Sequence, residues 1–182
     1  MSRNTNFRAL HDLGLAAWFG GTLANAVALN PAAGQAGGST RTGAVANVGW
    51  DRWTPVNAAA IGAHLAGSAG LLAADLPRVS AQRGVASMAM AKTALTVAAL
   101  GVTAYSRVLG KKVSARTDVP AASGTEPEPA TPDDVAAAQR QLRMLQWAVP
   151  ALTGALVVIS AFAGEQQRAT EVHKGLAGRL LG

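Results

Sequence analysis

Three ionisable side chains fall within apolar stretches of the sequence, at His11, His64 and Lys92. Because an ionisable group is costly to bury in hydrocarbon, such groups are candidate functional residues. An imidazole in this setting can ligate a haem or another metal, contact a quinone, or relay a proton. The lysine can instead extend its stem to the nearer membrane surface, or pair with Asp12. We therefore interpret His64 as the first candidate for cofactor binding and His11 as the second.

A structural role is the alternative for both histidines. His64 lies near the middle of the apolar run over residues 55–74, where its ring could bond to Asn25, to Ser68 or to a threonine of the next run, as polar groups between membrane helices often do. His11 lies close to the start of the first run and can reach the membrane interface. The sequence leaves both readings open.

His11 and His64 are expected to lie at different depths in the membrane. If the first two runs form antiparallel helices, His11 lies about four residues inside one face of the membrane and His64 about ten. That difference of roughly six residues corresponds to about 9 Å along the helix axis. Two axial ligands of one iron lie at nearly the same depth. We therefore do not expect His11 and His64 to share a haem.

Other kinds of site find no support in the sequence. The chain has no cysteine, which excludes disulfides, thiolate metal sites and cysteine nucleophiles. It has no phosphate-binding glycine loop, no Gly-x-Ser-x-Gly elbow and no His-Glu-x-x-His. The acidic residues gather in one loop and at the edges of the apolar runs, so no carboxylate pair is placed for hydrolysis. We predict no catalytic residues, no enzyme activity and no set of metal ligands, and the cofactor is not specified.

Long apolar runs predict the elements that must hold these residues. The chain is 49% hydrophobic and 14% charged, whereas soluble domains carry about 25% charged residues. Helices of about 20 residues can cross a hydrocarbon core of about 30 Å. We predict a single all-α domain, an integral membrane four-helix bundle that is multi-pass in the cell membrane, with spans at residues 7–29, 55–74, 85–108 and 144–163.

The connection between the first two spans predicts an interfacial segment. Trp50 and Trp53 favour the headgroup zone, where an indole ring and its N–H are both accommodated. Thr54 can cap the next helix and Pro55 suits its first turn. Asn30-Pro31 predicts the end of the first span.

The second half of the chain contains two segments outside the predicted spans. Residues 117–131 are acidic and rich in proline, which predicts disorder. The sequence Thr131-Pro132-Asp133-Asp134 is typical of a helix start, with acids near the positive end of the dipole. The basic tail over residues 165–182 has apolar residues at helical spacing and predicts an amphipathic interfacial helix.

Small residues predict how the helices pack. Close backbone approach is an important source of helix association in lipid. The second span carries two ladders of small residues, Gly62-Ala66-Gly70 and Ala59-Ala63-Gly67. We therefore expect this span to be the central helix, with two neighbours.

The basic charge indicates a membrane setting rather than nucleic-acid binding. The net charge of +6 comes from Arg and Lys residues that flank the apolar runs, and the chain has only one Tyr and three Phe. We predict contact with the lipid bilayer, no nucleic acid, and a homo-oligomer or a membrane protein partner. The 16 Arg and Lys residues divide evenly between the two sides of a four-span topology, so the positive-inside rule gives no orientation.

The segment from His11 to Gly21 reads His, six residues, Trp, one residue, Gly-Gly. It resembles the first-helix signature of copper-resistance D-like membrane proteins, which implies a membrane helix and hints at metal handling. The whole chain also resembles four-span actinobacterial membrane proteins of uncharacterised activity. Copper-resistance D-like proteins are generally larger, and soft copper(I) ligation here would lack a cysteine.

These observations give an order of hypotheses. The first is a non-enzymatic membrane scaffold or accessory subunit. The second is a haem-, metal- or quinone-binding membrane protein that uses His64. The third is a small transporter component.

Overall fold

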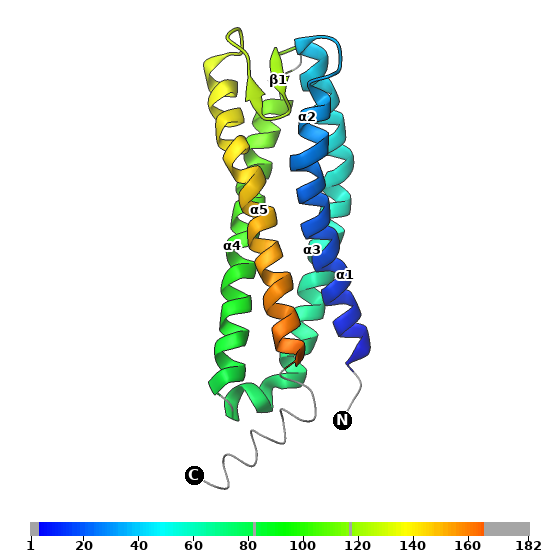
Figure 1. Ribbon diagram of the computed structural model, residues 1–182, viewed down its shortest axis with the longest axis vertical. Helices are drawn as coiled ribbons and strands as arrows, with labels where there is room; N and C mark the ends of the chain where they lie inside the picture. Colours follow the sequence, from blue (N-terminus) through cyan, green and yellow to red (C-terminus); the bar gives the residue numbers. More distant parts are fainter. Residues whose placement is uncertain (1–3, 82, 117, 166–182) are drawn as a thin grey trace.

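Four long antiparallel helices make up most of the molecule (Figure 1). The computed structural model describes residues 4–81, 83–116 and 118–165. The first helical path begins and the last helix ends at the same end of the bundle. The elements in chain order are α1 (Thr5–Ala24), η1 (Asn25–Leu29), α2 (Asn30–Ala33), α3 (Ser39–Ala81), α4 (Arg83–Ser114), β1 (Ala121–Ser123), β2 (Glu126–Pro127) and α5 (Asp133–Glu165).

The first helical path is longer than predicted. After α1, the backbone widens to a π-helix in η1 and returns to an α-helix in α2. The predicted end at Asn30-Pro31 is wrong, because Pro31 falls in the first turn of α2. Pro31 lies inside a continuous helical path, directly after the π-helical turn, where the ladder of i to i−4 hydrogen bonds is already interrupted.

Helix α3 absorbs most of the segment that we predicted to be interfacial. It runs without interruption from Ser39 to Ala81 and contains Pro55 in its interior. Thr54 does not cap a new helix; its hydroxyl donates to the carbonyl of Trp50 at 2.8 Å, within the same helix. Membrane helices tolerate an internal proline when nearby side chains help to satisfy the backbone. Helix α3 therefore begins well before the predicted start of span 2.

A short hairpin lies at the end of the bundle opposite the start of α1 (Figure 1). Strands β1 and β2 pair antiparallel within residues 117–131, the segment whose composition favours disorder. Ala121 and Thr125 are buried, and the backbone N–H of Gly124 donates to the carbonyl of Asn30 at 3.2 Å. Contacts with α2 and α3 therefore order a sequence that has no core of its own.

Helix α5 begins at Asp133, as the two acids in its first turn predict. The hydroxyl of Thr131 does not cap this helix. It donates to the carbonyl of Pro120 at 2.6 Å and accepts from the N–H of Glu128 at 2.8 Å, which closes the hairpin. The predicted amphipathic tail over residues 165–182 lies outside the described residues, apart from the last residue of α5.

Three helices, α3, α4 and α5, are long and apolar enough to cross a membrane. Their most apolar windows face outward, since only 17%, 6% and 22% of these windows is buried inside the protein. Large exposed apolar side chains follow the same surface, among them Met90, Val97, Val108 and Phe162. A surface of this kind suits lipid and indicates a membrane protein. Helix α1 is not among the three, and its sequence includes the polar pair His11-Asp12.

The helices pack as two pairs, α1 with α3 and α4 with α5. Helix α3 has two helix neighbours, α1 and α4, as its small-residue ladders predict, and Gly67 and Gly70 of these ladders lie against α1. It is not more central than α1, which contacts both α3 and α5. Within the described part of the chain, a Cβ at Gly62 would meet nothing within 4 Å. The core between the pairs is formed by Trp18, Ala60, Ala99 and Val149.

Candidate functional site

The closest approach of α1 and α3 is built from one short pattern that occurs on each helix. His11 and Gly14 are three residues apart on α1, and His64 and Gly67 are three apart on α3. A Cβ at Gly14 would collide with the backbone of His64, and a Cβ at Gly67 would collide with the backbone of His11. Each glycine thus lets the backbone beside the opposite histidine come into contact, as small residues do between membrane helices.

This reciprocal packing brings His11 and His64 together. Their ring centres are 4.6 Å apart and the ring planes are tilted by 49°. Each residue is only 1% exposed. The expectation that the two histidines lie at different depths is therefore wrong. The predicted span boundaries placed His64 in mid-membrane, whereas the glycine contacts set the actual register of the two helices.

Nδ1 of each imidazole ring already has a hydrogen-bond partner. Nδ1 of His11 lies 2.7 Å from the Asp12 carboxylate, and Nδ1 of His64 lies 3.4 Å from the backbone carbonyl of His11. Both partners are acceptors, so each Nδ1 carries the proton and donates when the ring is neutral. Each Nε2 then presents a lone pair. None of the structural partners that we considered for His64 is used.

Both Nε2 atoms are buried and have no hydrogen-bond partner among the described residues. Trp18, fully buried, lies close to the pair, with its ring centre 6.1 Å from that of His64. Buried polar atoms without partners are uncommon and call for an explanation. Two unpaired acceptors in contacting rings can bind a metal cation or a hydrogen-bond donor.

A cavity of about 660 Å³, the lower cavity, adjoins His11. It is lined from all four long helices, and its charged lining residues are Arg8, Asp12, Asp75 and Lys92. Lys92 thus faces the same space as Asp12, the partner that the sequence suggested for it. His11 forms part of the wall of this cavity, whereas His64 is not among its lining residues.

The spacing of the rings decides which groups fit. With a metal–nitrogen distance of about 2.0 Å and about 1.1 Å from nitrogen to ring centre, two trans ligands hold their ring centres about 6 Å apart. Ligands at angles between about 90° and 110° hold them roughly 4.4–5.1 Å apart. The observed 4.6 Å does not fit a haem iron held between the rings, and it is compatible with two neighbouring ligands of one metal ion outside a haem.

Asn30 is a connecting residue that sequence reasoning missed. It is 1% exposed and donates from Nδ2 to Gln146 of α5 at 2.8 Å. Its Oδ1 accepts from the indole N–H of Trp50 on α3 at 3.0 Å. An asparagine beside a proline favours a helix end, although an asparagine in an apolar run is also a signal for an interhelical hydrogen bond.

Comparison with known proteins adds no assignment: no family model, curated protein or solved structure matches this chain. Within the described ranges, no group of three or more His, Cys, Asp and Glu residues could hold a metal ion. The functional argument therefore depends on the geometry of the histidine pair.

Proposed function

We propose that the chain is a non-enzymatic, multi-pass protein of the cell membrane that binds a transition-metal ion between the Nε2 atoms of His11 and His64. In this proposal, the path from α1 to α2 forms a fourth span beside α3, α4 and α5. The observation that carries it is the contact of two buried rings, 4.6 Å apart, whose Nε2 atoms are unpaired.

The surroundings of the pair support metal binding over hydrogen bonding alone. Metal-ligating histidines usually donate their other N–H to a carboxylate or to a backbone carbonyl, which fixes the ring and raises its basicity. Asp12 provides the first kind of partner to His11, and the carbonyl of His11 provides the second kind to His64. Imidazole ligands suit zinc and copper.

The small number of ligands favours a labile site. Structural zinc sites are closed by four protein ligands, whereas sites that exchange or react keep open positions. Two histidines leave positions that water or a ligand from the lower cavity can fill. We therefore favour metal transfer or metal sensing over permanent structural binding. This agrees with the hint of metal handling in the resemblance of residues 11–21 to copper-resistance D-like proteins, which itself stays a prediction.

The test is metal affinity in lipid nanodiscs, measured for zinc and for copper by competition with a chelator. The wild-type protein should bind one ion, and His11→Gln and His64→Gln should each weaken binding at least tenfold. His173→Gln, which changes the remaining histidine of the sequence, is the matched control and should bind normally. Equal affinity in all four proteins would refute the assignment, and helix content by circular dichroism shows that the variants are folded.

The four-span topology has a separate test. Because the chain has no cysteine, single cysteines at Thr5, in the first turn of α1, and at Ala122, an exposed residue of β1, can be labelled selectively in sealed vesicles. The two positions should react from opposite sides of the membrane, since they lie at opposite ends of the bundle (Figure 1). Labelling of both from the same side would contradict α1 as a span.

A further inference from the structure

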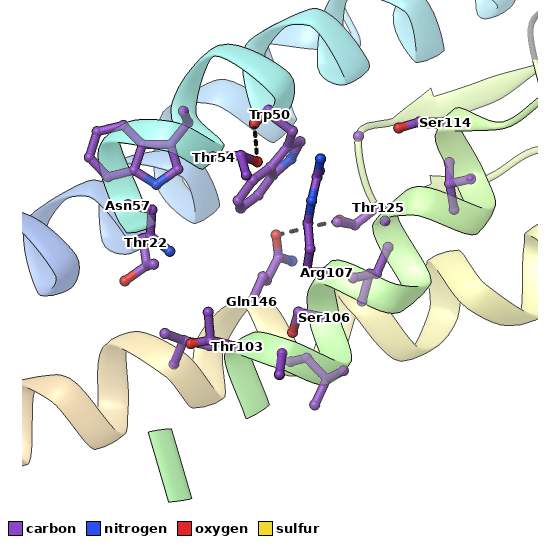
Figure 2. Close-up of a pocket in the computed structure, with 18 of the residues that line it drawn as sticks. Thr22, Trp50, Thr54, Asn57, Thr103, Ser106, Arg107, Ser114, Thr125 and Gln146 are labelled. Atoms are coloured by element: carbon purple, nitrogen blue, oxygen red, sulfur yellow. Dashed lines mark hydrogen bonds between the residues drawn. The ribbon is translucent and has the colours of Figure 1, made fainter. Parts of the chain in front are cut away.

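A second cavity, the upper cavity, lies between the helix pairs on the hairpin side of Trp18. It has a volume of about 330 Å³ and is lined from α1, α3, α4, α5 and the hairpin. In Figure 2, Asn57 and Thr103 lie toward one end of this cavity, whereas Arg107, Gln146 and Thr125 lie toward the other. Neither His11 nor His64 lines this cavity.

Three polar atoms of the lining are buried and have no partner in the described part of the chain. They are Nε1 of Trp53, Oδ1 of Asn57 and Oγ1 of Thr103. Trp53 and Asn57 are four residues apart on α3, so their side chains lie on one face, a turn apart. Leaving a buried donor or acceptor unpaired costs about 1–3 kcal/mol for each group. Their gathering around one cavity indicates a bound polar group.

The atom types specify that group. Trp53 can only donate and Oδ1 of Asn57 can only accept, while the hydroxyl of Thr103 can do either. A hydroxyl group on a ligand accepts from the indole and donates to the amide oxygen. A carbonyl or ether oxygen satisfies the indole but leaves Asn57 unpaired.

The rest of the lining sets the size and charge of the ligand. Most of the exposed surface of the wall is apolar, with Ile61, Leu100 and Leu145 among the contributing residues, and polar side chains also line it. Arg107 is the only charged residue of the described lining, and its guanidinium lies 3.4 Å from the Asp51 carboxylate. The cavity is therefore suited to an uncharged molecule with an apolar body.

We propose that the upper cavity binds an uncharged, membrane-soluble amphiphile whose polar end is a hydroxyl group, held between Trp53 and Asn57. Its apolar body lies along the aliphatic wall between the two helix pairs. This site is separate from the histidine pair, and its occupation does not depend on a metal.

Three matched probes test the proposal. 4-Octylphenol carries the hydroxyl, 4-octylanisole replaces it with a methyl ether, and octylbenzene has no oxygen. Nanodiscs with the protein and matched empty nanodiscs are equilibrated with each probe, and the retained probe is quantified by mass spectrometry. We expect saturable binding of the phenol, at about one per protein above the empty discs, and at least tenfold weaker binding of the other two, because they leave Asn57 unpaired.

Protein variants locate the binding. Trp53→Phe and Asn57→Leu should each weaken phenol binding about tenfold. Gly21→Ala should do so as well, because a Cβ at this position would collide with the indole of Trp53 and displace it. Trp147→Phe is the matched control, since Trp147 is 51% exposed and lies outside the lining; it should bind normally.

Three results would overturn the proposal. One is equal retention of octylbenzene and octylphenol, which would show partition into an apolar space. The second is normal phenol binding by both Trp53→Phe and Asn57→Leu, and the third is the absence of saturable binding by the wild type. Thermal unfolding of each variant in the same discs confirms that the bundle is intact.

Discussion

Replacing Gly14 with alanine tests the packing that builds the histidine pair. A Cβ at this position would lie 2.5 Å from the carbonyl oxygen of Ala60, and it would also collide with the backbone N of His64. Ordinary contacts of this kind are 3.4–4 Å. Because both neighbours are backbone atoms, no side chain can rotate away. Helices α1 and α3 must therefore separate locally by about 1 Å, as overpacked interfaces do.

The separation has two measurable consequences. Overpacking of this size costs about 1–3 kcal/mol of unfolding free energy. A shift of about 1 Å also moves the ring centres from 4.6 Å to about 5.6 Å, beyond the roughly 5.1 Å at which neighbouring ligands share one ion. Gly14→Ala should therefore lower the stability of the bundle and weaken metal binding at least tenfold.

Unfolding in mixed micelles and chelator competition in nanodiscs are the two assays. Gly20→Ala, on the same helix, is the control, because a Cβ at Gly20 would meet nothing within 4 Å among the described residues. Alanine favours a helix over glycine by up to about 1 kcal/mol, so Gly20→Ala should be equally or more stable and should bind metal normally. If Gly14→Ala matched this control in both assays, the proposed register of α1 and α3 would be wrong.

Three further substitutions test separate parts of the account. Asp12→Ala removes the carboxylate that orients the neighbouring imidazole and should lower metal affinity about 10- to 100-fold; it also leaves the buried Nδ1 of His11 unpaired and should lower the unfolding free energy by about 1–3 kcal/mol. Asn30→Leu leaves the polar groups of Trp50 and Gln146 without their shared partner, and it should cost about 1–3 kcal/mol of stability while metal affinity, measured in nanodiscs, stays normal. Leu156→Ala removes a fully buried side chain and should cost about 2–5 kcal/mol, read from the unfolding midpoint.

The helical class could be predicted from the sequence because composition and run length carry it directly. Apolar runs located α3, α4 and α5, and the two acids located the start of α5. The boundaries of the helices could be predicted less well from the sequence. Helix α3 continues through Pro55, as membrane helices can, whereas the local signal of Thr54-Pro55 is that of a helix start.

The sequence predicted His11 and His64 as the residues of the site, but it did not predict that their rings are in contact. Hydropathy placed His11 and His64 inside helices, but the depth of a residue in a run does not fix the register between two helices. That register depends on the collisions that Gly14 and Gly67 avoid. The repeated His-x-x-Gly pattern was present in the sequence as a signal, although only the tertiary contact shows that each glycine faces the other histidine.

The hairpin shows a different limit. Residues 117–131 have a composition that cannot form a core, yet Ala121 and Thr125 are buried against other elements. Their order comes from long-range contacts such as the hydrogen bond from the Gly124 N–H to the Asn30 carbonyl. The composition of a segment alone does not predict such long-range contacts.

The most direct test of the histidine pair is X-ray absorption spectroscopy of the protein loaded with one equivalent of zinc or copper in nanodiscs. The account predicts two imidazole nitrogens at about 2.0 Å, with light oxygen or nitrogen neighbours in the remaining positions. It also predicts that the multiple-scattering signal of imidazole falls in His11→Gln and in His64→Gln. A spectrum without imidazole, or one unchanged in both variants, would contradict metal binding by His11 and His64.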